Sequence, residues 1–398
     1  MSRLEFPLRS EDFRPPTDLA ALGSRGLIVG ALAAVATAAG FFLDGEHFFP
    51  SYLVAWLLWF MVSSGCLGLL LLHHLSGGAW GLVLRRQMEA GARTLPYVGL
   101  FALPLFFGLD RLFVWADPAQ VEADHLLHHK APYLNGPFFI ARTVVAIAIF
   151  SFLAYKLSAT SARQDEEGDG GKAVSMRRLS AVGFLVFALV SSFLGFDWLM
   201  SLDPHYFSSL YGAIFLTGQG LSGLIFLILI SVFLRQREPM SEVFARRYFH
   251  DFGKLLFAFV MFFTYLGISQ FIITYQGDLP EEVVWYKERF HGPWAWVAAG
   301  LLVFHFFFPF LILLSRSVKE NARALAAIAG FVLVMRLVDL IWNSRPSLVH
   351  EGFGLHWLDL VAPVAVGGLF LFLFARELGR RPLLPVNDPF LREALGRD

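Results

Sequence analysis

The sequence predicts an all-α protein that crosses a membrane about ten times. Three observations support this fold class. Of the 398 residues, 56% are hydrophobic and only 16% are charged, and the mean hydropathy is +0.59. These values are far too apolar for a soluble domain of this length. Ten apolar segments are also long enough to cross the roughly 30 Å hydrocarbon layer as helices. We therefore expect the bilayer to be the solvent of most of the chain.

The ten segments are separated by polar connections, and together they divide the chain into five regions. These regions are a cytoplasmic N-terminal arm (1–25), spans one to four (26–156), a cytoplasmic linker (157–178), spans five to ten (179–375) and a cytoplasmic tail (376–398). The expected spans are Gly26–Leu43, Ser51–Leu72, Leu95–Trp115, Pro137–Lys156, Leu179–Met200, Phe207–Leu234, Phe252–Tyr275, Trp294–Leu314, Ala322–Ile341 and Trp357–Phe374.

The even number of spans places both termini on one side, and the basic residues indicate which side. About three quarters of the 32 Lys and Arg residues lie on the arm, the tail and the connections of that side. The opposite side carries only Lys130, Lys287, Arg289 and Arg345 outside the spans. Basic residues favour cytoplasmic loops, so we expect both termini to be cytoplasmic and the turn at Asp203 to face outward.

Three connections carry individual predictions. Residues Ala79–Arg93 have the pattern of an amphipathic helix on the inner surface, and an ordinary loop helix fits the same pattern. The polar, Gly-rich stretch Ser158–Arg178 is typical of a mobile linker. The outer connection contains His125, His128 and His129, which could bind a metal ion, although a solvated docking loop is the simpler interpretation.

The cysteine content and the charge pattern exclude several kinds of site. The only cysteine, Cys66, lies inside an apolar segment. A disulfide framework, a cysteine-ligated zinc site, an iron–sulfur cluster and covalently attached haem therefore lack their ligands. A bis-histidine haem would need two facing histidines, and His305 has no partner at matching depth. No basic tract suggests a nucleic-acid partner.

Charged residues inside the expected spans are candidates for function, because each costs several kcal/mol in hydrocarbon unless it is paired or hydrated. Arg336 and Asp339 share a helix face and can pair locally, and Asp110 could pair with Arg142 between neighbouring helices. Ion pairs that only hold helices together are the alternative. The charges in the middle or outer part of the spans are Asp110, Arg111, Arg142, Asp197, Arg336, Asp339 and Asp359.

The inner half of the spans has fewer polar groups, namely His73, His74 and Lys254, and His305 lies near mid-membrane. The inner and outer sets could line two half-channels, with His305 passing a proton between them, because the unperturbed pKa of histidine lies near physiological pH. A histidine in a Phe-rich helix can instead serve only as an interhelical hydrogen-bonding partner.

Three stretches resemble a known family. They are FDWLMSLDPHYFSSLYGAIFLTGQGLSG, DFGKLLFAFVMFFTYLGISQFIITYQGDLPEE and HHLSGGAWG. They are similar to the second of the two NrfD-like, polysulfide-reductase-type membrane subunits of bacterial alternative complex III, the ActF family. The resemblance covers essentially all ten spans. It implies two four-helix bundles with flanking helices, in a bacterial inner-membrane complex that oxidises quinol and reduces cytochrome c or an oxidase.

The resemblance also implies partners and cofactors. The expected partners are the other NrfD-like subunit, an iron–sulfur/molybdopterin-like subunit and a multihaem cytochrome c, with a cytochrome oxidase as a further candidate. Haem c and iron–sulfur clusters are expected on those partners, and this chain is expected to hold no cofactor of its own. The other NrfD-like subunit is the expected quinol site.

Two functions remain open, and a third is weaker. In the first, the chain is structural and conducts protons without redox chemistry, using His73, His74, Asp197, Asp203, His205, Lys254, His305, Arg336, Asp339 and Asp359. In the second, it binds quinol at Asp110, Arg111, Arg142 and Asp197, where an acidic or histidine side chain accepts a hydroxyl proton. A secondary transporter would need inverted repeats and broken helices, and no convincing repeat is present.

Overall fold

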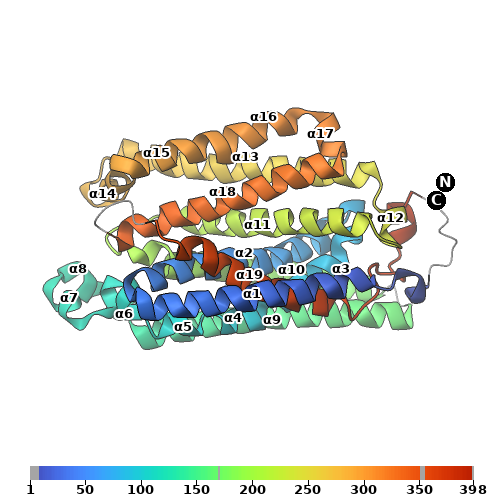
Figure 1. Cartoon of the computed structure of the whole chain (residues 1–398), viewed down its shortest axis with the longest axis horizontal. Helices are drawn as coiled ribbons and strands as arrows, with labels where there is room; N and C mark the ends of the chain where they lie inside the picture. The colour runs from blue at the N-terminus through green and yellow to red at the C-terminus, as the bar shows by residue number, and fades with distance from the viewer. Residues whose placement is uncertain (1–8, 169–170, 350–354, 397–398) are drawn as a thin grey trace.

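A computed structural model describes residues 9–168, 171–349 and 355–396, and secondary structure within these ranges is helical. Among the described residues, nine helical segments are long and apolar enough to cross a membrane. They run along one common axis, with both chain ends at the same end of the molecule (Figure 1). We call this the terminal end and the opposite one the distal end. Residues 1–8 of the expected arm and 397–398 of the expected tail lie outside the described residues.

The long elements agree closely with the expected spans. They are α1 (Thr17–Leu43), α2 (Gly45–Ser76), α9 (Gly136–Glu167), α10 (Gly171–Trp198), α11 (Tyr211–Arg235), α13 (Arg246–Gly277), the consecutive α15 (Gly292–Gly300), η4 (Leu301–Phe307) and α16 (Phe308–Leu314), α18 (Ala322–Leu348) and α19 (Leu358–Leu378). The membrane-protein fold class is therefore confirmed.

Shorter elements connect these helices or begin and end the chain. They are η1 (Ser10–Phe13), α3 (Ala79–Arg93), α4 (Leu95–Leu100), α5 (Leu103–Phe106), α6 (Leu109–Leu112), η2 (Val114–Ala116), α7 (Pro118–Ala123), α8 (His125–Lys130), η3 (Met200–Leu202), α12 (Met240–Val243), α14 (Pro280–Arg289), α17 (Arg316–Glu320) and α20 (Leu391–Ala394).

The expected third span, Leu95–Trp115, is not one continuous helix. It consists of α4, α5 and α6, each six residues or shorter. Pro96 and Pro104 stand at the starts of α4 and α5. Proline lacks a backbone N–H and is favoured in the first turn of a helix, so each of these prolines begins a new short helix instead of extending the previous one.

The prediction of a surface helix at Ala79–Arg93 is wrong, because α3 is buried inside the protein. The chain from α3 to α4 runs antiparallel to α2. Ser63 donates to the Gly91 carbonyl (3.0 Å), Trp56 to the Val98 carbonyl (2.9 Å) and Tyr52 to the Phe101 carbonyl (2.9 Å). The stretch that packs along α2 therefore begins at α3, about one helix earlier than the apolar pattern indicates. Hydropathy did not predict the burial of this helix because it carries charges, and those charges pair both within the helix and with residues distant in sequence.

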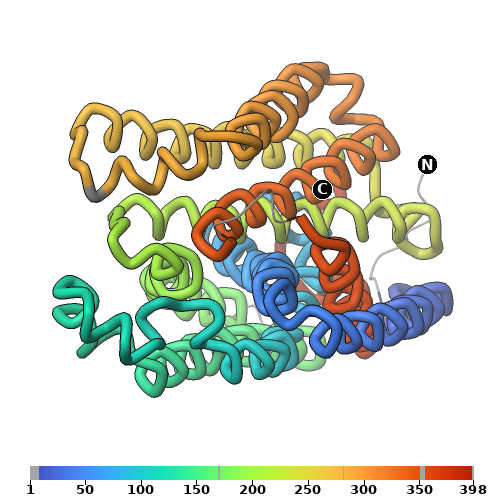
Figure 2. The backbone as a smooth tube through the Cα atoms, turned by 60° about the vertical axis from the view of Figure 1, so that its left-hand side comes forward, coloured from blue at the N-terminus to red at the C-terminus, as the bar shows by residue number. Residues whose placement is uncertain are grey.

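The crossings form two groups with one flanking pair. The first group contains α2, the segment from α3 to α6, α9 and α10, the second contains α11, α13, the segment from α15 to α16, and α18, and α11 packs closely against α2 where the groups meet. Helices α1 and α19 pack along each other (Figure 2), and α19 also packs against α2 and α3 of the first group. At Gly30 a Cβ would lie 2.9 Å from backbone atoms of Gly368, so glycine lets these two helices approach closely.

The segment expected to be a linker is helical over most of its length. Helix α9 continues to Glu167 and α10 starts at Gly171, and both belong to the first group. The two groups are instead joined by the turn between α10 and α11, which contains Asp203. At the terminal end the two chain ends meet, since the Leu383 N–H donates to the Phe13 carbonyl (2.8 Å).

A reporter fusion tests the orientation of this bundle. We expect a reporter fused after Asp398 to be active in the cytoplasm, because most basic residues lie at the terminal end. A second fusion in the turn after Asp203 should give the opposite result. Periplasmic activity of the first fusion would invert the proposed orientation.

Candidate functional site

The centre of the second helix group holds a histidine in an unusual turn of helix. His305 lies in η4, a π-helical segment within the eighth crossing. Pro309 follows four residues later, and the ring of a proline clashes with the carbonyl of the residue four positions before it. A π-helical turn relieves this clash, and such turns occur frequently at functional sites.

The His305 side chain is 4% exposed, and its ring centroid lies 5.2 Å from that of Phe263. Its Nε2 atom has no hydrogen-bond partner among the described residues. A buried polar atom without a partner costs free energy, so it marks a place where water or a ligand would be favourable.

An ion pair lies beside His305, as the sequence predicts. Arg336 Nη1 is 2.6 Å from Asp339 Oδ2, and Asn343 Nδ2 donates to Asp339 Oδ1 (3.3 Å). The guanidinium group stacks over Phe263 at 4.4 Å. Gly218 makes room for it, because a Cβ there would lie 2.7 Å from Arg336 Nη2. The local pairing of Arg336 with Asp339 is thus confirmed, and the pair is fixed by three helices.

A cavity of about 410 Å³ joins these groups to the distal end of the molecule. It extends from Tyr206 and Trp285, near the distal turns, to His305 and Asp339. Its wall is largely aromatic, with Gln270 among its few polar side chains. Burial raises the pKa of Tyr206 to about 12, so its hydroxyl remains a proton donor at neutral pH.

This arrangement suits two kinds of chemistry. An apolar cavity with a few converging polar groups is typical of sites for small amphiphilic molecules. A carboxylate and an imidazole in the same wall can also exchange protons with water that enters the cavity. Both uses depend on Asp339 and His305.

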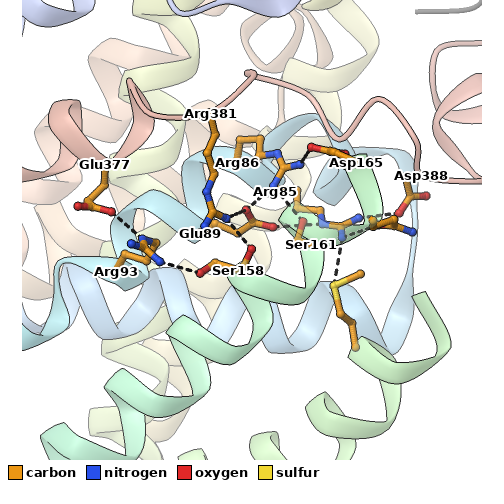
Figure 3. Close-up of polar contacts among 12 residues, drawn as sticks. Arg85, Arg86, Glu89, Arg93, Ser158, Ser161, Asp165, Glu377, Arg381 and Asp388 are labelled. Atoms are coloured by element: carbon orange, nitrogen blue, oxygen red, sulfur yellow. Dashed lines mark hydrogen bonds and ion pairs between the residues drawn. The ribbon is translucent and has the colours of Figure 1, made fainter. Parts of the chain in front are cut away.

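A second concentration of charge lies at the terminal end, on α3 (Figure 3). Arg85 pairs with Asp388 of the C-terminal segment (2.6 Å) and contacts Glu89 (3.3 Å). Arg86 pairs with Glu89 (2.7 Å) and with Asp165 of α9. The two arginine side chains are each 1% exposed. These are therefore fully buried ion pairs that join α3 to α9 and to the C-terminal segment.

The same network continues along α3 toward α19. Arg93 Nε donates to Glu377 Oε2 (2.6 Å), and Arg380 pairs with the other oxygen of Glu377 (2.5 Å). Arg381 lies 3.5 Å from Glu89 and donates to the Ser158 carbonyl (2.5 Å). Burial lowers the pKa of Arg381, and the neighbouring Glu89 carboxylate opposes this shift. Positive and negative groups alternate throughout, which satisfies charges that would otherwise be costly to bury.

A cavity of about 500 Å³ adjoins this network. Its wall contains His73, His74, Arg85 and Asp388. The Nδ1 atom of His73 has no partner in the part of the chain that the structure describes. The predicted inner-half residues His73 and His74 thus both line one cavity.

The other predicted ion pair, between Asp110 and Arg142, is not found. Arg142 forms a two-bond pair with Asp197 (2.9 and 3.0 Å), so the expected pairing of Arg142 with Asp110 is wrong. Asp110 instead lies 3.9 Å from Arg111, with both side chains about two thirds exposed. Asp110 and Arg111 lie on α6, whereas Arg142 lies on α9 beside Asp197. The four residues predicted to bind quinol do not line the distal cavity.

The remaining predicted residues lie on separate parts of the surface or in other pairs. Asp359 pairs with Arg345, and Lys254 with Asp251 (3.4 Å). His205 is 2.8 Å from Asp124, and Asp203 is partly buried in the same distal turn. The three histidines His125, His128 and His129 are exposed on α8 or at its start.

Sequence reasoning missed Glu89, Asp165 and Asp388 as partners of buried arginines. The spacing of Arg85, Arg86 and Glu89 is the one available signal, because residues three and four apart share a helix face. The π-helical turn was also missed, although Pro309 four residues after His305 indicates a distortion there.

The comparisons with known proteins add no family. The sequence matches no family model, and no curated protein matches it.

We expect Glu89→Gln to lower the free energy of unfolding by about 3–5 kcal/mol, because it leaves Arg85 and Arg86 buried without their shared carboxylate. The measurement is thermal or denaturant unfolding of the purified protein in mild detergent. The control Glu320→Gln removes a surface pair with Arg316 and should leave stability nearly unchanged. Equal stability of the two variants would contradict a stabilising role for the network.

Proposed function

We propose that this chain is an integral membrane subunit of a quinol-oxidising respiratory complex of the alternative complex III type. In this proposal it holds other subunits and conducts protons, and it carries no redox cofactor of its own. The family resemblance suggests the complex. The observation that carries the proton-conducting role is the position of Asp339 and His305 in the wall of one cavity.

The distal half of the proposed route starts at the cavity. A cavity of about 410 Å³ has room for several waters, and Tyr206, Gln270 and Asn343 offer them hydrogen bonds. Arg336 supplies a fixed positive charge that lets Asp339 be ionised inside the protein. His305 Nε2 lies free to accept or donate a hydrogen bond at the deep end of the cavity.

The terminal half of the route starts at His73 and the adjoining cavity. Ser231 of α11 donates to Gln87 of α3 (3.1 Å), which adds buried polar groups next to the charged network. Nearer to Arg336, both side-chain polar atoms of Gln219 are buried and unpaired in the described structure. Residues 223–230 of α11, between these groups, are apolar. The arrangement supports two polar half-routes separated by an apolar layer, not an open channel.

The proposed partners are the second NrfD-like subunit, an iron–sulfur/molybdopterin-like subunit and a multihaem cytochrome c, with a cytochrome oxidase downstream. They would carry the haem c and iron–sulfur clusters. Large apolar side chains such as Phe42, Phe107 and Trp296 are more than 80% exposed, which supports lateral contact with lipid or with such subunits. The proposed location is a bacterial inner membrane with the terminal end in the cytoplasm.

We expect Asp339→Asn to lower proton transfer per electron in the reconstituted complex, because the change keeps the size of the side chain and removes its titratable group. The complex, isolated through a tag on this chain, should keep its multihaem and iron–sulfur subunits. The matched control Asp18→Asn removes an exposed carboxylate that pairs with Arg237 and should change neither measurement.

An unchanged proton-to-electron ratio in Asp339→Asn would overturn the proton-conducting role. Where the Asp339 variant fails to assemble, His305→Gln gives the same test without breaking the ion pair. Isolation of the chain as an active transporter without any companion subunits would count against the complex itself.

A second function, quinol binding, is favoured by one observation: the distal cavity is lined by Tyr206, Trp285, Tyr286 and Phe290 and reaches His305 and Asp339. Aromatic walls suit a quinol ring, and His305 or Asp339 could accept a hydroxyl proton. In this form of the proposal the site moves from Asp110, Arg111, Arg142 and Asp197 to the distal cavity.

We expect Gly267→Leu to abolish labelling of this chain by a photoreactive quinone if the cavity binds quinol, because Gly267 lines the cavity and has open space beside it. Gly300→Leu is the matched control, since Gly300 also has open space but does not line the cavity. Equal labelling of both variants, or none of the unaltered protein, would remove quinol binding from this chain and leave the proton-conducting proposal intact.

A further inference from the structure

Two histidines and an aspartate meet at the distal end of the flanking helix pair. Asp44 lies in the one-residue connection between α1 and α2, and His47 lies in the first turn of α2. His356 comes just before α19, far away in the sequence. The sequence gives no short motif for this group, because the fold alone brings the third residue to the other two.

The ligand atoms of the three side chains converge. His47 Nδ1 lies 3.0 Å from both carboxylate oxygens of Asp44, and His356 Nε2 lies 3.4 Å from Asp44 Oδ2. One such atom from each residue lies within 4.8 Å of the others. In a tetrahedral zinc site with bonds of about 2.0–2.1 Å, neighbouring ligand atoms are about 3.3 Å apart. The observed separations therefore need only small side-chain adjustments to admit an ion.

The two imidazole rings are also prearranged. They are stacked with centroids 4.7 Å apart and planes inclined by 22°. The backbone N–H of His356 donates to Asp359 Oδ2 (2.9 Å), which fixes the segment that carries the ring. Asp44 caps the start of α2 by accepting from the His47 N–H (3.4 Å). Supporting contacts of this kind hold metal ligands in place in known sites.

The composition of the group indicates which ion would bind. Imidazole nitrogen together with a single carboxylate suits zinc and related transition metals, whereas calcium and magnesium prefer several oxygen ligands. All three residues are partly exposed, so an ion can enter from water and keep a water molecule as its fourth ligand. Arg345, the nearby cation, is paired with Asp359 and does not compete for Asp44.

We propose that Asp44, His47 and His356 form a binding site for one divalent transition-metal ion, with Zn²⁺ as the best match. A bound ion would join the connection between α1 and α2 to the start of α19. It would therefore hold together the distal end of the flanking pair, beside the ion pair of Arg345 with Asp359.

The test uses the full chain, isolated in mild detergent with any subunits that accompany it, stripped with a chelator and then titrated with Zn²⁺. We expect one high-affinity zinc ion per chain and a higher melting temperature with zinc. Co²⁺ in place of Zn²⁺ should give the visible absorption of a four-coordinate site with nitrogen and oxygen ligands.

His47→Gln and His356→Gln should each weaken zinc binding by at least about tenfold and remove the thermal shift. The double variant His128→Gln, His129→Gln, on the exposed α8, is the matched control and should bind zinc as the unaltered protein does. Helical content measured by circular dichroism shows whether each variant folds. Zinc binding that survives both site variants, or that is lost only in the α8 control, would overturn the proposal, as would no binding by the unaltered protein.

Discussion

The structure depends on one electrostatic constraint: a charge carried into the interior of a membrane protein needs a partner there. Removing an ion from water costs several kcal/mol, and only a close counter-charge with good geometry repays it. Helix α3 carries Arg85, Arg86 and Glu89 into such an interior, and its neighbours supply Asp165 and Asp388. These ion pairs join α3 to α9 and to the C-terminal segment, while α2, within the described residues, packs against α3 without an ion pair.

The same constraint explains how much of the fold the sequence could predict. Ten apolar runs predicted ten spans, and nine of these coincide with the long apolar helices of the described residues, because hydrophobic length is a local property. The third crossing was misplaced because its first part, α3, is charged, and the partners that make its burial possible lie on α9 and in the C-terminal segment. No window of sequence around Arg85 contains Asp388. Hydropathy measures the cost of burying a charge and does not include the partner that offsets it.

In the candidate site, contacts within one helix could likewise be predicted from the sequence, whereas contacts between helices could not. The pair of Arg336 and Asp339 was predictable, since three residues along one helix fix their distance. The partner of Arg142 was not, because Asp110 and Asp197 are equally plausible on depth alone and only the packing of α9 against α10 selects Asp197. The distal cavity could not be predicted either. Its wall includes side chains from α13, α14, η4 and α18, so its presence depends on how these elements pack and not on the sequence of any one of them.

The separation of 303 residues in the sequence between Arg85 and its partner Asp388 has a consequence for biosynthesis. Membrane proteins are inserted from the N-terminus as they are made, so α3 emerges from the ribosome long before the residues that complete its network. Until residues 381–388 have been made, Arg85 lacks its Asp388 partner and Glu89 lacks Arg381. The first helix group can then reach its final packing only after that segment has been made. The C-terminal segment is thus the last part of this network to be made, and without it Arg85 would keep only its contact with Glu89 among the ion pairs that the structure describes for it.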